Sequence, residues 1–334
     1  MDELRYARNI SFAPIGKKGQ EKLCASTAAV IGLGAVGTPA AAYLARAGVN
    51  IILIDHDIVE KSNLQRQILY TEKDALGAVP KAEAAKMALE SANPDINIDA
   101  YAEELTSRNM GELLGRADIV IDATDNLETR FRLNDWCVKN GKAWVFSAAI
   151  GDKGMSATMV PGSSCLRCFM PKAGAGMLPT CESEGIMGPA AGIAGAIGAS
   201  EAIKYITGAG KPNTQLLHFR LLDMSFELIK INKDKACKTC GKREFEFLEG
   251  KGRVSARVCA DAFQINYKGG IDIGLAEKRA RKIPECRVLL ASRTVLAVDM
   301  LGARVTLFGS GKAIVKNCAT EAKAKNIAAK LVSA

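Results

Sequence analysis

Residues 28–57, AAVIGLGAVGTPAAAYLARAGVNIILIDHD, contain the pattern that decides the fold. A short apolar run leads into a glycine-rich turn, and a stretch of small, helix-prone residues follows the turn. The turn has the spacing G-x-G-x-x-G and is formed by Gly32, Gly34 and Gly37. Residues 51–54 are apolar and mostly β-branched, as a strand buried on both faces should be, and Asp55 follows them. The stretch therefore predicts a strand-helix-strand unit of a parallel sheet whose turn approaches a nucleotide.

The glycine spacing by itself does not choose between a nicotinamide or flavin cofactor, another nucleotide and a purely structural turn. The residues after the second strand favour a triphosphate, because they add amides and cations that a dehydrogenase does not need. These polar residues are Asp55, Asp57, Asn63, Gln65, Arg66, Gln67 and Lys81. Arginine offers a planar fork to phosphate oxygens and lysine a compact charge, so the set suits ATP. The alternative from local chemistry is a solvated polar loop.

Composition limits the classes of function. The chain has 334 residues, enough for two lobes, and a net charge of +9 that is spread along the sequence rather than gathered in basic runs. Nucleic-acid binding is therefore not expected. We find no uninterrupted apolar run of membrane-spanning length and no signal peptide at the polar start, which predicts a cytoplasmic protein that does not bind membranes. Ten cysteines in such a chain indicate metal or thiol chemistry rather than disulfides.

A second acidic segment follows a later predicted strand. The stretch ADIVIDATDN, residues 117–126, runs from an apolar strand into Asp125. Ligands of open parallel sheets lie beyond the carboxyl ends of the strands, so Asp125 is expected to share a crevice with Asp55 and Arg66. A carboxylate beside a triphosphate is a natural magnesium ligand. The alternative role for Asp125 is to cap the helix that follows.

Two C-x-x-C pairs predict a zinc site. They are Cys165, Cys168, Cys237 and Cys240. Each pair offers two thiolates to a tetrahedral ion, and four thiolates leave no open position for a substrate, so the site is expected to be structural. Redox dithiols are the alternative. A redox pair would be expected at a helix start, and neither pair precedes a clear helical pattern.

Cys181 stands apart from these pairs. It lies between a Gly/Pro-rich stretch and a predicted small-residue helix over residues 189–207. A position before a helix favours the thiolate, so the residues leave a reactive and a structural role equally open.

An ordered series of motifs resembles the MoeB/ThiF/HesA family of ubiquitin-like-protein activating enzymes. The resemblance covers residues 3–243. Its motifs are RYARNI, the glycine turn, IDHDIVEKSNLQRQILY, GAVPKAE, DATDNLETRFRLND, CLRCF, TCESEGIMGP and CKTCG. It implies an α/β fold with a Rossmann-like, mostly parallel sheet and a zinc-stapled antiparallel portion.

The resemblance also implies an adenylyltransferase. With ATP and Mg²⁺, such an enzyme adenylates the C-terminal glycine of a small ubiquitin-like or sulfur-carrier protein ending in Gly-Gly, and pyrophosphate leaves. By position, Gly34 lies against the nucleotide, Asp55 holds the ribose, and Asn63, Arg66 and Lys81 contact phosphates. Asp125 places magnesium, and Gln67, Arg5 and Asn134 are secondary candidates.

Two further residues gain roles from the resemblance. Arg8 lies on what the pattern alone describes as a solvated helix face, but the family arginine reaches into the site of a neighbouring subunit, which implies a homodimer. Cys181 matches a cysteine that bonds covalently to the carrier in some members and is dispensable for adenylation in others. The sequence leaves both roles open, along with a separate sulfur donor and the downstream pathway. A peptide or small-carboxylate substrate and a non-catalytic nucleotide-binding scaffold are the rival functions.

The C-terminal part has a different pattern. Residues 249–334 predict several short strands and two helices, typical of a small α+β domain, after an adenylation domain over residues 1–248. The segment FGSGKAIVKN, residues 308–317, lacks P-loop spacing, and we assign it no phosphate.

Overall fold

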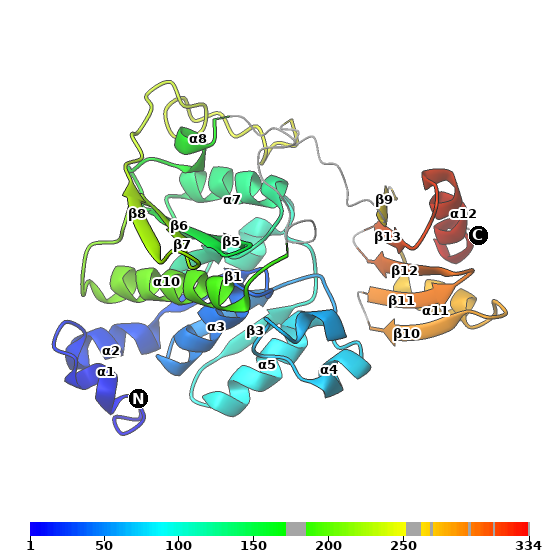
Figure 1. Ribbon diagram of the computed structural model, residues 1–334, viewed down its shortest axis with the longest axis horizontal. Coiled ribbons are helices and arrows are strands. Elements are labelled where there is room, and N and C mark those ends of the chain that lie inside the picture. Colours follow the sequence, from blue (N-terminus) through cyan, green and yellow to red (C-terminus); the bar gives the residue numbers. More distant parts are fainter. Residues whose placement is uncertain (172–184, 252–261, 268–269, 293–294, 310, 333–334) are drawn as a thin grey trace.

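The computed structural model describes residues 1–171, 185–251, 262–267, 270–292, 295–309 and 311–332. These residues form an eight-stranded sheet of order β3-β2-β1-β4-β5-β6-β7-β8 and a five-stranded sheet of order β10-β11-β12-β13-β9 (Figure 1). Among them, no helix combines the length and the apolar character needed to span a membrane.

Five of the eight strands of the larger sheet are parallel to one another. They are β1 (Thr27–Ile31), β2 (Asn50–Ile54), β3 (Ile98–Tyr101), β4 (Ile119–Asp122) and β5 (Ala143–Ile150). Strand β1 pairs with β2 on one side and β4 on the other, so Val30 lies level with both Leu53 and Ile121. The strand order reverses at β1, and a crevice for a ligand is expected there. The predicted Rossmann-like sheet is confirmed.

The remaining strands of the larger sheet are antiparallel. Strand β5 turns at Gly151 into β6 (Lys153–Met159), and the sheet continues through β7 (Leu216–Arg220) and β8 (Ser225–Ile229). A Cβ atom at Gly154 would overlap the ring of Phe219, its partner on the neighbouring strand β7, so glycine is needed at this position of β6. The predicted antiparallel portion is therefore also present.

Helices cover both faces of the larger sheet (Figure 1). They are α1 (Ala7–Ser11), α2 (Gly16–Ala25), α3 (Gly37–Arg46), α4 (Glu72–Leu76), α5 (Lys81–Ala92), α6 (Met110–Leu114), α7 (Leu127–Asn140), α8 (Leu166–Phe169) and α10 (Gly188–Thr207), with a 3-10 turn at Lys61–Asn63. Helices α3, α5 and α10 bury one face, while α6 and α7 bury the other. The small residues of α10 allow it to pack closely against the start of α3, where a Cβ at Gly195 would lie 2.3 Å from the Val36 carbonyl oxygen.

The smaller sheet has its own core. Its elements are β9 (Ala262–Asn266), α11 (Ile273–Ala280), β10 (Arg287–Ala291), β11 (Val295–Met300), β12 (Ala303–Phe308), β13 (Lys312–Lys316) and α12 (Glu321–Val332). All of its strand pairs are antiparallel, and apolar side chains of both helices pack on the sheet. The predicted α+β character is confirmed. The boundary between residues 248 and 249 stays a prediction.

Candidate active site

The three glycines of the turn have different local surroundings. Gly32 has φ +82°, and a Cβ there would lie 2.8 Å from the Ala123 carbonyl oxygen. A Cβ at Gly37 would lie 1.8 Å from the Gly32 carbonyl oxygen. Gly34 is different, because the nearest atom to a Cβ there, Gln67 Nε2, is 3.9 Å away. Gly32 and Gly37 are thus required by packing, whereas Gly34 leaves space in which a ligand can approach the backbone.

Asp55 holds the glycine turn from the end of β2. Its Oδ2 accepts a hydrogen bond from the Leu33 amide at 2.6 Å, and its Oδ1 accepts one from the Asp57 amide at 2.8 Å. The side chain is buried, and burial raises the pKa of Asp55. A carboxylate oxygen can accept more than one hydrogen bond, so both oxygens remain able to accept from ribose hydroxyls.

Lys81 begins α5 and turns back to the same strand end. Its Nζ donates to Asp57 Oδ2 at 3.0 Å, and its side chain is 8% exposed compared with 48% for Asp57. Burial would lower the pKa of Lys81, but the charges of Asp57 and Asp55 outweigh it and raise that pKa above its ordinary value. Burial would likewise raise the pKa of Asp57, yet Lys81 and His56 hold it well below the usual range. The pair is therefore an ionised contact beside the glycine turn.

Asp125 lies in the loop between β4 and α7. Its side chain is exposed, and it follows the carboxyl end of β4, at the same edge of the parallel strands as Asp57 after β2. The alternative prediction that Asp125 caps the helix is wrong. Asn126 is the cap, and its Oδ1 accepts from the amides of Glu128 at 2.9 Å and Thr129 at 3.3 Å. The Asp125 carboxylate is left facing solvent, where it is accessible to a cation.

A buried ion pair supports this loop, and sequence reasoning missed it. Arg130 Nε lies 3.4 Å from Asp122 Oδ2, with both side chains almost completely buried. The guanidinium also donates to the Thr124 carbonyl oxygen and lies 4.8 Å from the centroid of the Phe146 ring. Burial raises the pKa of Asp122, and the charge of Arg130 opposes that rise. Arg130 thus fixes the backbone immediately before Asp125.

The segment after β2 contributes amides to the same region. Gln67 is buried next to Gly34, and its Oε1 has no hydrogen-bond partner among the described residues. The Asn63 Oδ1 accepts from the Glu60 amide at 3.0 Å, closing the 3-10 turn. Arg66 is half-buried, and its Nη1 donates to the Ser62 carbonyl oxygen at 2.8 Å. Gln67 thus places its amide group next to the open Gly34, with an oxygen acceptor that no described residue uses.

Tyr70 is a second residue that sequence reasoning missed. Its hydroxyl donates to the Leu33 carbonyl oxygen at 2.7 Å and lies 3.4 Å from the Lys81 carbonyl oxygen. Burial raises the pKa of Tyr70, so the hydroxyl keeps its proton. This ring links the glycine turn to the start of α5 and positions Lys81.

The remaining predicted residues lie elsewhere. Arg8 is exposed on α1, which packs against α2, and Arg5 pairs with Asp95 at 2.9 Å. Asn134 accepts a hydrogen bond from the Leu166 amide at 2.9 Å, so it anchors α8 on α7 rather than facing the glycine turn. Cys181 lies outside the described residues.

The four predicted zinc ligands come together. Their sulfur atoms all lie within 4.8 Å of one another, with Cys165 3.7 Å from Cys237 and Cys168 3.4 Å from Cys240. Four clustered sulfurs suit a tetrahedral zinc ion.

One detail of the sequence prediction at this cluster is wrong. A helical turn, α8, does follow Cys165 directly, with Cys165 at its N-cap position. The turn has only four residues, and the second pair crowds both sulfurs. The cluster is also tied to α7, because Asp135 accepts from the Thr239 hydroxyl at 2.7 Å and the Phe247 amide at 2.9 Å. The site therefore joins distant segments, as a structural zinc site would.

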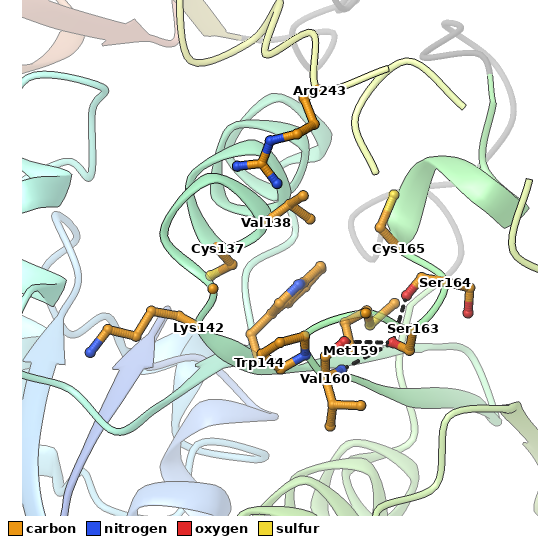
Figure 2. A pocket seen from close by; sticks show the side chains of 13 residues that line it. Cys137, Val138, Lys142, Trp144, Met159, Val160, Ser163, Ser164, Cys165 and Arg243 are labelled. Atoms are coloured by element: carbon orange, nitrogen blue, oxygen red, sulfur yellow. Dashed lines mark hydrogen bonds between the residues drawn. The ribbon is translucent and has the colours of Figure 1, made fainter. Parts of the chain in front are cut away.

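Figure 2 shows a cavity beside this cluster, between the end of α7 and the loop that precedes α8. Trp144, Cys137 and Arg243 line it together with the Ser163 turn, whose hydroxyl donates to the Val160 carbonyl oxygen at 2.8 Å. Among the described residues that line it, none belongs to the set around Gly34. The cavity is therefore separate from the candidate nucleotide site.

Comparison with known proteins gives the family. The model of the ThiF family matches residues 6–239, which include the glycine turn, Lys81, Asp125 and three of the four clustered cysteines. The chain belongs to the ThiF family. The predicted family resemblance is thereby confirmed.

Two relatives of this chain have names that describe the activation of small carrier proteins. The chain is 36% identical over 334 residues to the sulfur carrier protein ThiS adenylyltransferase of Bacillus subtilis, covering 97% of each chain. It is 36% identical over 248 residues to the SAMP-activating enzyme E1 of Haloferax volcanii, covering 73% of this chain and 91% of the relative.

A solved structure shows the same fold. The Escherichia coli MccB structure with MccA-N7isoASN superposes with a TM-score of 0.63 at 23% identity, covering 72% of this chain and 75% of that one. At that identity, the likeness concerns the fold alone.

Proposed function

We propose that this protein adenylates the C-terminal glycine carboxylate of a small ubiquitin-like sulfur-carrier protein, using ATP and releasing pyrophosphate. Membership of the ThiF family supports this, as do relatives named as adenylyltransferases of the carrier ThiS and as a SAMP-activating enzyme. The observation that carries the proposal is the ion pair of Lys81 and Asp57 beside the open Gly34. It combines a fixed cation with space for a nucleotide.

The reaction needs positioning more than acid-base chemistry. A carboxylate oxygen of the carrier attacks the α-phosphorus of ATP, and the bond from that phosphorus to the bridging oxygen of the β-phosphate breaks. The bond electrons leave with pyrophosphate, and no proton has to move. Gly34 would lie against the nucleotide and Asp55 would accept from the ribose hydroxyls, while Asn63, Arg66 and Lys81 would contact phosphate oxygens. Gln67 would add an acceptor from its unpaired Oε1.

Asp125 is the residue that would hold magnesium. Its exposed carboxylate lies at the same edge of the parallel strands as Asp57, and hard oxygen ligands suit Mg²⁺. When bound, the ion would neutralise charge on the phosphates. Arg130 would keep the loop in place through its contact with Thr124.

The assembly and the carrier step are part of the same proposal. Arg8, exposed on α1, would reach into the site of a second copy, so the active form would be a homodimer in the cytoplasm. The carrier would end in Gly-Gly, and Cys181 would either bond to it after adenylation or be dispensable. In the second case a separate sulfur donor would finish the reaction. The cysteine cluster would hold a structural zinc ion.

The test is exchange of labelled pyrophosphate into ATP, measured with a panel of small Gly-Gly-ending proteins. We expect exchange that depends on one carrier and on magnesium. Exchange without any carrier, driven by a free peptide or small carboxylate, would change the substrate class. ATP binding without exchange by any substrate would identify a nucleotide-binding scaffold instead. Non-reducing electrophoresis of wild type and Cys181→Ala then shows whether a covalent carrier adduct requires that cysteine.

A further inference from the structure

The last residue of β12 and residues of β13 in the smaller sheet contact residues that follow β2 and β3 in the larger one. The rings of Phe308 and His56 meet edge to face, with their centroids 5.5 Å apart. Lys312 Nζ lies 3.6 Å from Glu104 Oε2, in the segment that follows β3. A third contact, Lys316 with Glu60 at 3.9 Å, is more exposed. The smaller sheet thus reaches the carboxyl ends of β2 and β3.

Lys312 is unusual among the cations of this region. The residue is 8% exposed, yet its nearest carboxylate oxygen lies beyond hydrogen-bonding distance. Within the described part of the chain, its ammonium has no hydrogen-bond acceptor, although it lies 5.8 Å from the centroid of the Phe308 ring. The stem of Lys312 is held against the protein, while its Nζ atom keeps contact with solvent and has donors that no described residue uses. Its positive charge also contributes to the low pKa of Asp57.

Phe308 and Lys312 lie where the base of a bound nucleotide is expected. Phosphates at the glycine turn after β1 and a ribose at Asp55 after β2 would place the base farther along the same edge, towards β3. His56 and Glu104 flank that part of the edge, and they contact Phe308 and Lys312 respectively. A cation and an aromatic ring at this point can close the adenosine end of the site.

We propose that the smaller sheet completes the nucleotide site, with Lys312 and Phe308 closing its adenosine end. This rests on the proposed adenylation function and deepens it, because it makes the C-terminal part of the chain a determinant of nucleotide affinity. The matched region of the Haloferax volcanii relative is 248 residues and already covers 91% of that protein. The contribution is therefore an addition to a site that the larger sheet can form.

The experiment compares full-length variants by titration calorimetry with ATP and with AMP, and by the KM for ATP in carrier-dependent exchange. The variants are Lys312→Gln, Lys312→Arg, Phe308→Leu and, as a control in the same sheet unit, the exposed Lys330→Gln on α12. We expect Lys312→Gln and Phe308→Leu each to weaken ATP binding by about threefold to tenfold, with kcat within about twofold of wild type. The affinity for AMP should fall by the same factor, because AMP contains the same adenosine group. Lys312→Arg and Lys330→Gln should bind as wild type does.

The outcomes separate this inference from the proposed function. Unchanged affinity of Lys312→Gln for both nucleotides, in a protein whose melting temperature and zinc content match wild type, would overturn the inference alone. Weaker binding of ATP with unchanged binding of AMP would place Lys312 at the outer phosphates and also overturn it. Absence of ATP binding by the wild-type protein would instead overturn the adenylation proposal.

Discussion

Lys81 Nζ and Asp57 Oδ2 lie 3.0 Å apart, although Asp57 follows β2 and Lys81 begins α5. The folded-state pKa of Asp57 is lowered, so its contribution to stability is present above about pH 4 and is lost as pH falls through the lowered value. The pKa of Lys81 is raised, so its contribution is present below about pH 10 and is lost as pH rises through the raised value. The pair is therefore ionised across the physiological range.

This pair leads to the first prediction. Lys81→Ala should lower pyrophosphate exchange by about 100-fold, because it removes a positioned cation from the phosphates. The matched control is Lys86→Ala in the same helix, where Lys86 pairs with Glu90 nearer the surface. In wild type, the exchange rate between about pH 5 and 9 should show no change caused by titration of this pair, because both groups stay ionised there. Equal exchange by Lys81→Ala and Lys86→Ala would refute this role.

Neighbouring substitutions separate magnesium binding from helix capping. Asp125→Ala should raise the magnesium concentration needed for half-maximal exchange and lower the maximal rate by roughly 100-fold. Asn126→Ala should instead cost about 1 kcal/mol of stability through loss of the cap, and should keep most of the exchange activity at low temperature. Magnesium titrations and urea unfolding measure the two effects. An unchanged magnesium dependence in Asp125→Ala would remove this residue from the metal site.

Two glycines of the same turn should respond differently to alanine. Gly34→Ala has space for its Cβ, so its melting temperature should stay within about 2 °C of wild type while ATP affinity falls. Gly37→Ala would place its Cβ 1.8 Å from the Gly32 carbonyl oxygen, and it should be strongly destabilised or insoluble. Calorimetric melting and ATP titration distinguish the cases. Normal ATP affinity in Gly34→Ala would show that the nucleotide does not approach this backbone.

The buried pair of Asp122 and Arg130 should dominate stability near the site. Arg130→Gln leaves the Asp122 carboxylate without its buried partner, and we expect a loss of about 3–5 kcal/mol in urea unfolding. The exposed pair of Arg116 and Asp99 serves as the control, since Arg116→Gln should cost at most about 1 kcal/mol. Similar costs for the two variants would mean that the buried pair is not held as described.

Zinc should be measurable and structural. Protein purified without chelator should contain about one equivalent of zinc, and Cys168→Ser should lose the metal together with thermal stability. Cys318→Ser, between β13 and α12, should retain both. Elemental analysis and melting curves provide the readout. Wild-type protein free of metal but fully stable would favour redox dithiols.

The sequence was sufficient for the parts of the site that depend on local pattern. The glycine spacing, the apolar run before Asp55 and the two C-x-x-C pairs each follow from backbone geometry or ligand chemistry over a few residues. Each of these patterns appears in the folded chain where it was expected.

The rest depends on contacts between residues far apart in the chain. Tyr70 reaches Leu33, and Lys312 reaches Glu104, and no local pattern marks either contact. The choice between Asp125 and Asn126 as the helix cap was also beyond the sequence, because both side chains cap helices well. Similarly, the sequence does not show whether the Arg130 side chain is buried or solvated.

The cysteine cluster also determines when, during synthesis of the chain, a zinc ion can be fully coordinated. Each contact between the two pairs joins sulfurs that are 72 residues apart, with α10, β7 and β8 in the intervening segment. When the first pair leaves the ribosome, the second pair has not yet been made, so a zinc ion can then have only two of its four thiolates. Complete coordination must wait until the antiparallel strands have been translated. Firm retention of zinc by a nascent chain would therefore mark the point at which the antiparallel part of the larger sheet has been completed.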